Sequence, residues 1–399
     1  MAGRGKTGFL RARGGHSHAR VTNIELFFDL VFVFAITQLS HTLLHHLSIG
    51  GALQTGLLFL AVWWVWIYTS WVTNWLDPER GLVRLALLLL MLAGLALSTS
   101  LPKAFAEKGL AFASAYVFMQ VGRSLFMVWT LRGHSPGNAR NFQRITLWSA
   151  AAGVLWIVGA LLEGESRFGL WAAALAIEYA GPSLGFFVPG LGASTTADWD
   201  VEGEHLAERC GLFIIIALGE SVLVTGATMA DLAWDATTLT AFAVAFVGSA
   251  AMWWIYFDTG AERGSRLIGE SEDPGRIARL AYTYLHLLIV AGIIVAAVSD
   301  ELLLAHPHGH VEASTTAAML GGPALFVAGN MLFKWVVAGR CPLSHLGGLV
   351  LFAVLVPLAH DLTPLLLAAG AALVLVVVAG WEWASLRHHR ANVPVRSHT

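Results

Sequence analysis

The sequence predicts an all-α protein: a polytopic bundle of about 12 transmembrane helices arranged as two parallel six-helix repeats. The first observation is composition, because 56% of the 399 residues are hydrophobic and 13% are charged, against roughly 45–50% and about 25% in soluble domains. The second is a series of apolar runs long enough to cross a bilayer. The third is an uneven distribution of Lys and Arg around those runs. Together they predict a multi-pass membrane protein.

Apolar runs of about 18 to 25 residues have the length that a membrane helix needs. They are separated by turn signals such as Asp77-Pro78, Ser135-Pro136-Gly137 and Asp273-Pro274-Gly275. The predicted spans cover 25–46, 52–74, 83–101, 110–131, 145–162, 168–189, 207–229, 238–258, 280–304, 318–338, 343–360 and 364–386. The start of the chain lacks an apolar core of signal-peptide length, so residues 1–22 are expected to form a flexible basic arm.

The Lys and Arg residues indicate how the predicted spans are oriented. Lys103, Lys108 and Arg167 fall in the turns that follow odd-numbered spans, and Arg123 and Lys334 fall inside spans. The other 19 of the 24 Lys and Arg residues lie on the opposite side. Because positively charged loops are retained in the cytoplasm, both termini are expected to be cytoplasmic, and the membrane is expected to be the cell's inner (plasma) membrane.

Short sequence matches recur in the same order in the two halves of the chain. FAITQ at 34–38 aligns with IALGE at 216–220, WIY at 66–68 with WIY at 254–256, RLA at 84–86 with RLA at 279–281, and GRSLF at 122–126 with GNMLF at 329–333. Six helices return the chain to its starting side, so the repeats are expected to be parallel. The predicted organisation is a cytoplasmic arm (1–22), a first repeat (23–190), a cytoplasmic linker (191–205), a second repeat (206–386) and a cytoplasmic tail (387–399).

Two long motifs carry a family resemblance. ELFFDLVFVFAITQLSH begins at Glu25, and HLAERCGLFIIIALGES runs from His205 to Ser221. Together they resemble the bacterial low temperature requirement A family of polytopic membrane proteins. The resemblance covers nearly the whole chain and implies a link to growth at low temperature, but it implies no substrate and no reaction. Cys210 stands where an aromatic residue is expected in the family.

Three charged residues lie deep within predicted spans, where a charge costs about 2.5–3.5 kcal/mol on insertion scales and needs an interior partner. Glu220 is expected to pair with Arg123 or to bind a proton or cation, and the two roles are compatible. Glu178 precedes Gly181-Pro182, and Pro182 cannot donate to the carbonyl of Glu178, so span 6 is expected to be kinked or open there. Glu220, Glu178 and Arg123 are therefore the candidate ion- or proton-binding residues. The alternative for Glu178 is an ordinary proline kink with the carboxyl group bonded to a neighbouring Ser or Tyr.

Four charged residues lie near the starts of spans 1 and 7. Glu25 and Asp29 are four residues apart on one helix face, in the first turns, where carboxylates interact favourably with the helix dipole. They are expected either to be structural, as caps or as partners of Arg80 or Arg209, or to line a cytoplasmic entrance. With Glu208 and Arg209 they form the candidate cytoplasmic gate.

Other polar residues are secondary candidates. Thr37 and Gln38 lie on span 1 above the acidic pair, and His286 in span 9 could relay protons or serve as a hydrogen-bonded core histidine. The histidines of HPHGH at 306–310 are not interleaved with Cys or carboxylates in a metal-site pattern, so no metal site is predicted. Cys210 and Cys341 lack CxxC spacing, which argues against a cysteine metal site or a disulfide framework.

The sequence contains no P-loop, GxSxG, HExxH or dinucleotide-binding motif, so the protein is not expected to be an enzyme and no cofactor is predicted. Repeats, an interrupted helix and buried acids are typical of secondary transporters. The hypothesis is ion- or proton-coupled transport of an unknown small solute. The expected partners are the lipid bilayer, a proton or monovalent cation and that solute, with no nucleic acid. The alternatives are a cation channel or leak pathway, and a non-transporting membrane scaffold or sensor linked to growth at low temperature.

Overall fold

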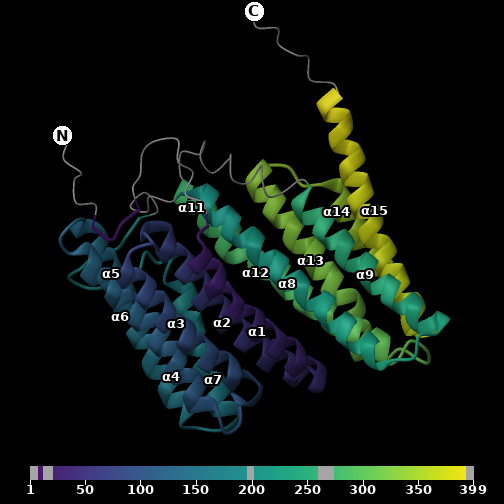
Figure 1. Ribbon diagram of the computed structural model, residues 1–399, viewed down its shortest axis with the longest axis horizontal. Helices are drawn as coiled ribbons and strands as arrows, with labels where there is room; N and C mark the ends of the chain where they lie inside the picture. The colour runs from purple at the N-terminus through teal and green to yellow at the C-terminus, as the bar shows by residue number, and fades with distance from the viewer. Residues whose placement is uncertain (1–7, 12–20, 196–201, 259–273, 392–399) are drawn as a thin grey trace, which may run out of the picture. The chain divides into compact units, whose positions relative to one another are not determined.

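The computed structural model describes residues 8–11, 21–195, 202–258 and 274–391 (Figure 1). These residues form helices joined by short connections and no strand, which confirms the all-α class. Contacts divide the chain into two units: unit 1 comprises Met1–Arg209 and Ser271–Ala278, and unit 2 comprises Cys210–Glu270 and Arg279–Thr399. The predicted boundary at 205–206 lies within the first turns of helix α8 (Gly203–Asp231), four residues before this division.

Unit 1 is built from the helices labelled α1 to α7 in Figure 1, together with the start of α8 and the short α11. Their bounds are α1 Asn23–His45, α2 Ile49–Trp75, α3 Gly81–Ser100, η1 Leu101–Lys103, α4 Gly109–Val117, η2 Phe118–Gly122, α5 Arg123–Leu131, α6 Pro136–Ala160, α7 Gly164–Ala180 and α11 Pro274–Ala278. Helix α1 packs against α2 and α3, whereas α6 packs against α4, α5 and α7. The segment η2 is π-helical, a geometry that is rare and frequent at functional sites.

Unit 2 contains the remainder of α8 and the helices that follow it. Their bounds are α9 Ala236–Phe257, η4 Arg279–Leu285, α12 His286–Ala305, α13 Ala313–Ala338, α14 Leu343–Leu358, η5 Ala359–Asp361 and α15 Pro364–Ala391. Helices α12 and α13 approach so closely that a Cβ on Gly292 would lie 2.4 Å from the backbone nitrogen of Phe326, and one on Gly322 would lie 2.7 Å from that of Ala296. Glycines therefore let these two backbones pack directly against each other.

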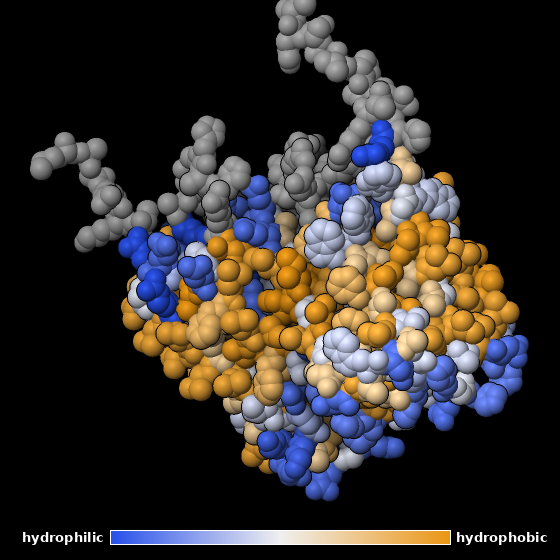
Figure 2. Space-filling model, turned by 45° about the vertical axis from the view of Figure 1, so that its right-hand side comes forward, coloured by the Kyte–Doolittle hydropathy of each residue, from blue (hydrophilic) through white to orange (hydrophobic). Residues whose placement is uncertain are grey.

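Within the described residues, ten helical segments are long and apolar enough to cross a membrane. They coincide with the predicted spans except 145–162 and 168–189, whose positions are taken by α6 and α7. Helix α6 carries Arg140 and Arg144 in its first half, and α7 has 17 residues. Figure 2 shows large hydrophobic areas on the visible surface, with hydrophilic residues gathered in separate patches. A multi-pass membrane protein is therefore supported, and the full count of twelve spans stays a prediction.

The end of α7 differs from the sequence prediction. The helix stops at Ala180, and turns follow it, so the predicted continuation of span 6 to residue 189 is wrong. Pro182 has no N–H for the carbonyl of Glu178. The N–H of Gly181 donates instead to the carbonyls of Ile177 (3.0 Å) and Glu178 (3.3 Å). The Gly-Pro pair therefore ends the helix, and the Glu178 carbonyl is not left open.

Local interactions fix where several helices begin. Thr22 and Glu25 form a capping box at the start of α1, the arrangement in which two otherwise unpaired helix N–H groups are satisfied reciprocally. Asp235 caps α9 by accepting a hydrogen bond from the backbone N–H of Thr238 at 2.8 Å. That N–H holds the pKa of the Asp235 carboxyl below its usual range.

Part of the N-terminal arm is held in place, although it was expected to be flexible. Leu10 forms an antiparallel bridge with Leu76, and the N–H of Arg11 donates to the carbonyl of Trp75 at 2.9 Å. The arm therefore contacts the end of α2, and Arg11 Nη2 also lies 2.9 Å from Glu25 Oε2 in the first turn of α1.

Candidate functional site

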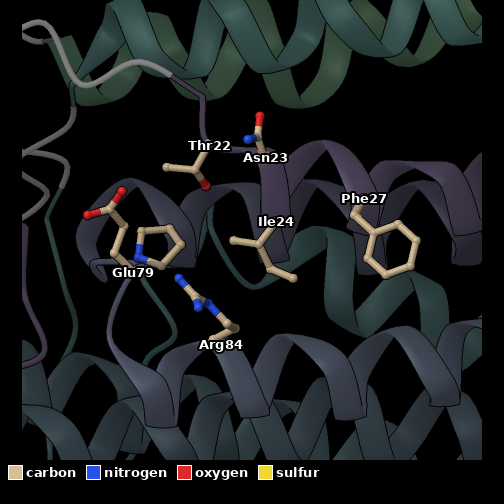
Figure 3. A pocket seen from close by; sticks show the side chains of 7 residues that line it. Thr22, Asn23, Ile24, Phe27, Glu79 and Arg84 are labelled. Carbon is tan, nitrogen blue, oxygen red and sulfur yellow. The ribbon is translucent and has the colours of Figure 1, made fainter.

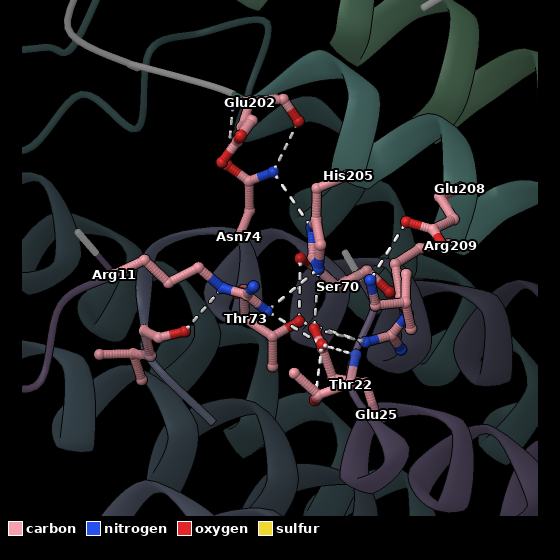
Figure 4. A network of polar contacts seen from close by, with 12 residues as sticks. Arg11, Thr22, Glu25, Ser70, Thr73, Asn74, Glu202, His205, Glu208 and Arg209 are labelled. Atoms are coloured by element: carbon pink, nitrogen blue, oxygen red, sulfur yellow. Dashed lines mark hydrogen bonds and ion pairs between the residues drawn. The ribbon is translucent and has the colours of Figure 1, made fainter. Parts of the chain in front are cut away.

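A buried polar network surrounds the start of α1 in unit 1 (Figure 4). The Glu25 carboxylate is fully buried and contacts three basic side chains in addition to Thr22. Arg11 Nη2 lies 2.9 Å from its Oε2, and His205 Nε2 and Arg209 Nη1 lie 2.9 and 3.2 Å from its Oε1. We call the set Arg11, Glu25, Asp29, His205 and Arg209 the α1 network.

Asp29 is joined to the same network through Arg209, whose Nη2 lies 2.6 Å from Asp29 Oδ1. Trp66 of α2 donates its indole N–H to the same oxygen at 2.8 Å. Among the residues that the structure describes, Asp29 Oδ2 and Arg209 Nε have no hydrogen-bond partner. Since one guanidinium joins two fully buried carboxylates, Arg209 is the central cation of the network.

The surroundings of His205 indicate which ring nitrogen carries its proton. Asn74 Nδ2, which can only donate, lies 3.3 Å from His205 Nδ1. Nδ1 is therefore assigned as the acceptor and Nε2 as the donor to Glu25 at 2.9 Å. With this assignment Arg11 Nη2, 3.2 Å from the same Nε2, is a neighbour and not a hydrogen-bond donor to it. Asn74 also exchanges two hydrogen bonds with the backbone of Glu202, at 2.8 and 3.0 Å. The start of α8 is thereby fastened to the end of α2.

These contacts bear directly on the predicted gate residues. Glu25, Asp29 and Arg209 lie together as partners, one of the arrangements that the sequence left open. The Nε of Arg80, the other expected partner, pairs with Asp77 at 3.2 Å. Glu208 is exposed, and it accepts the N–H of Val21 at 3.1 Å.

Beside the α1 network lies a cavity of about 340 Å³ (Figure 3). Thr22 is shared between the two, since its hydroxyl donates to Glu25 Oε2 at 2.9 Å. The cavity is lined by Thr22, Asn23, Ile24, Phe27, Pro78, Glu79 and Arg84. It provides space for a small polar molecule next to the acidic start of α1.

A second buried cluster holds Glu178 at the end of α7. Tyr116 donates its hydroxyl to Glu178 Oε2 at 2.7 Å, and Trp156 donates its indole N–H to the same oxygen at 3.3 Å. Gln120, in the π-helical η2, donates to Oε1 at 3.3 Å. The described residues give Glu178 no ion pair, so its carboxyl group is held by neutral donors. Tyr116 is a partner of the kind named in the alternative for Glu178.

Arg123 is connected to this cluster through one side chain. Its Nη2 donates to Gln120 Oε1, and its Nη1 donates to Val65 O and Thr69 Oγ1, both at 3.1 Å. Its Nε has no hydrogen-bond partner within the described part of the chain. Arg123 and Glu178 are therefore linked through the Gln120 amide rather than by direct contact.

The remaining candidates lie in separate places. Glu220 is buried in α8 within unit 2, and its predicted pairing with Arg123 of unit 1 stays a prediction. Thr37 and Gln38 are half-buried on α1. His286 is fully buried, 2.8 Å from the Tyr256 hydroxyl and 2.8 Å from the carbonyl of Ala281. It has the surroundings of a hydrogen-bonded core histidine.

Unit 2 contains an ion pair that the sequence did not single out. Lys334 of α13 lies 2.8 and 2.7 Å from the two carboxylate oxygens of Glu382 in α15, and it donates to the carbonyl of Ile255 in α9 at 2.9 Å. The exposed fractions of the two side chains are 9% and 11%. The pair therefore joins three helices within the unit.

Lys334→Met is expected to lower the free energy of unfolding by about 3 kcal/mol, because it leaves Glu382 buried without its cation. Lys334→Met combined with Glu382→Leu is expected to cost less than about 1 kcal/mol, since no uncompensated charge remains. Thermal unfolding of the detergent-purified protein, followed by tryptophan fluorescence, measures both. Lys103→Met, which removes an exposed pair with Glu107, is the control and is expected to have little effect. Additive losses in the double variant would contradict the pairing.

Ten apolar helices among the described residues, together with buried charges that have internal partners, define an integral, multi-pass membrane protein of the all-α class. The chain matches the model of the family described as bacterial low temperature requirement A protein (LtrA) over residues 20–380. It therefore belongs to the LtrA family. An uncharacterized protein of Rhizobium meliloti (strain 1021) is 42% identical over 369 residues, which cover 92% of this chain and 90% of that protein. No solved structure matches the chain.

Proposed function

We propose that this LtrA family protein is a secondary transporter that couples movement of a proton or monovalent cation to movement of an unknown small solute. It would lie in the inner membrane with both termini in the cytoplasm, as the distribution of Lys and Arg indicates. We propose transport rather than enzymatic catalysis. No cofactor or nucleic acid enters the proposal.

The environment of Glu178 is the observation that carries this proposal. A buried carboxylate that is neutralised by an arginine stays charged, whereas one held by neutral donors can change its protonation when its surroundings change. Glu178 has the second kind of environment, formed by Tyr116, Gln120 and Trp156. Gln120 also contacts Arg123, so a change at Glu178 can alter the hydrogen bonds of a buried cation.

The packing of the two units supports an internal repeat, as secondary transporters often have. Four helix pairs of unit 1 have counterparts in unit 2. The pairs α3–α4 and α5–α6 correspond to α12–α13 and α13–α14. The pairs α6–α7 and α2–α7 correspond to α14–α15 and α9–α15. Each unit also directs a buried cation at a backbone carbonyl, from Arg123 to Val65 and from Lys334 to Ile255. In this proposal α7 and α15, the last long helices of the two repeats, are equivalent. Glu178 is the buried acid of α7 and Glu382 is the acid of α15.

The α1 network would serve as the cytoplasmic gate. Glu25 and Asp29 share the Arg209 guanidinium, and a change in their charge would loosen the start of α1. The neighbouring cavity at Thr22 and Arg84 would be the entrance for solute. Glu220, which is buried in unit 2, is kept as a further ion-binding candidate.

Flux measurements in liposomes test the class of activity. Purified protein is reconstituted with a pH-sensitive dye inside, the membrane potential is clamped, and a pH or Na⁺ gradient is imposed with and without a low-molecular-weight bacterial extract. A carrier is expected to give ion flux that saturates and that the extract accelerates. Large unitary currents in a planar bilayer would instead support a channel. Flux equal to that of protein-free liposomes under every gradient would contradict both.

One observation favours a scaffold or sensor as the second candidate. The charges of the α1 network are mutually paired, as expected of groups that only hold helices together. For a scaffold, Glu178→Gln would leave growth at low temperature intact in cells that depend on this protein. For a transporter, it would impair that growth.

A further inference from the structure

A small cavity lies among α9, α12, α13 and α15 of unit 2, near a carboxylate that has no other assigned role. Its volume is about 30 Å³, enough to hold one water molecule or a small ion. Ser249, Ser299 and Asp300 supply its polar side chains, and most of the rest of its wall is made of Ala, Gly and other apolar residues. An aspartate facing a cavity of this size within a membrane helix requires a partner.

A chain of hydroxyl groups leads to this carboxylate. Ser221 of α8 donates its hydroxyl to Asp300 Oδ2, and the hydroxyls of Ser221 and Ser249 are 2.8 Å apart. Because the single proton of Ser221 is used toward Asp300, Ser249 must be the donor to Ser221. The lone pairs of Ser249, which lines the cavity, therefore remain available to a cation.

A proline frees a further backbone oxygen on one of the helices that line the cavity. Pro323 lies inside α13, and both Pro323 and Met319 line the cavity. Pro323 has no N–H, so the carbonyl of Met319 does not receive the usual helical hydrogen bond from the residue four positions later. Helices α12 and α13 pack closely at Gly322, three residues after Met319, where a Cβ would lie 2.7 Å from the backbone nitrogen of Ala296, four residues before Asp300.

We propose that this cavity is a binding site for a monovalent cation with the chemistry of Na⁺, held by Asp300, Ser249, Ser299 and the Met319 carbonyl. Hard cations select carboxylate, hydroxyl and carbonyl oxygens. A single carboxylate balances one positive charge, and no ion pair of Asp300 occurs within the described part of the chain. The described residues contain no group of three or more His, Cys, Asp or Glu suited to a metal ion. The oxygen donors proposed for this cavity therefore differ from the ligands of a transition-metal site.

The role of this site as the place where the coupling ion binds rests on the proposed function. Binding of Na⁺ to the site can nevertheless be measured without transport. The test uses the full chain in detergent at constant ionic strength, with NaCl exchanged for KCl or choline chloride. A ligand that binds the folded state raises the melting temperature as its concentration rises. Na⁺ is expected to raise Tm in a saturating manner and choline is not, and Asp300→Asn is expected to weaken the apparent Na⁺ affinity by about tenfold or more.

Matched variants decide whether the effect belongs to this cavity. Asp361→Asn removes an exposed carboxyl group in the same unit and is expected to leave the Na⁺ response unchanged. Ser249→Ala retains the carboxylate and is expected to weaken the affinity less than Asp300→Asn; it also serves if Asp300→Asn does not fold. Equal shifts of Tm with Na⁺ and with choline would overturn the site. An unchanged Na⁺ response in Asp300→Asn would overturn it too. If Asp300→Asn does not fold, an unchanged Na⁺ response in Ser249→Ala has the same meaning.

The same experiment separates the two proposals. Proton-driven flux without any Na⁺-specific shift in Tm would overturn the Na⁺ site and leave secondary transport standing. A Na⁺-specific shift that Asp300→Asn removes, in a protein that moves no ion in liposomes, would support the site and overturn the transport proposal.

Discussion

Arg209→Ala is expected to destabilise the folded protein by about 3–5 kcal/mol. The reason is that Glu25 and Asp29 would both remain buried after the loss of the guanidinium that they share, and a buried charge without its partner is strongly unfavourable. Arg11 and His205 would still contact Glu25, but Asp29 would keep a hydrogen bond from Trp66 and no cation. Unfolding in detergent with increasing denaturant measures the loss.

Two controls identify the cause of that destabilisation. Arg80→Ala removes a partly exposed pair with Asp77 and is expected to cost less than about 1 kcal/mol. Adding Asp29→Asn to Arg209→Ala is expected to restore part of the stability, because it removes the charge that Arg209 neutralised. If Arg209→Ala costs no more than Arg80→Ala, Arg209 is not the central cation of the network.

Glu178→Gln is expected to leave the protein folded and to reduce ion flux in liposomes by more than about tenfold. The glutamine oxygen can still accept hydrogen bonds from Tyr116 and Trp156, so the cost in stability should stay within about 1–2 kcal/mol. What the amide cannot do is take up and release a proton. Infrared difference spectra between acidic and alkaline pH are expected to lose one carboxyl band in this variant.

The matched control for this prediction is Glu107→Gln, which removes a carboxyl group that is exposed and paired with Lys103. Its flux is expected to equal that of the unchanged protein. Tyr116→Phe removes one hydrogen bond to the Glu178 carboxylate while keeping the acid, and an intermediate flux is expected. Full flux in Glu178→Gln would show that the ion does not bind at this residue.

Much of the fold was predictable, because apolar length and turn residues alone define most helices. The predicted spans all coincide with helices, but the extent of α7 was missed. Its apolar sequence continues past Ala180, and Gly181-Pro182 was taken as a kink, whereas the structure ends the helix there. Whether a Pro bends or ends a helix depends on which groups bond to the backbone carbonyl that the Pro leaves unpaired. Those partners are set by tertiary packing.

The candidate sites were predictable where sequence spacing fixes the geometry. Glu25 and Asp29 share a helix face by their spacing, and Arg209 was one of two expected partners. Arg11 was missed because the basic arm shows no periodic pattern, although its backbone pairs with the end of α2. His205, four residues before Arg209, carried a usable signal, since that spacing places both side chains on one face of a helix.

Partners distant in the chain could not be predicted. Tyr116, Gln120 and Trp156 meet Glu178 only because α4, η2 and α6 pack around the end of α7. Asp300 is not among the sequence-based candidates, although it lies inside predicted span 9. Its contact with Ser221 of α8 and its place beside the cavity come from tertiary packing.

Ion flux in liposomes that contain either the unchanged protein or Glu178→Gln tests the central claim most directly. Both proteins are reconstituted at equal density, with the same imposed pH or Na⁺ gradient and a clamped membrane potential. Saturable flux in the unchanged protein, reduced to the level of protein-free liposomes by Glu178→Gln, is the predicted result. Equal flux in the two preparations, or none in either, would contradict coupled transport through this buried carboxyl group.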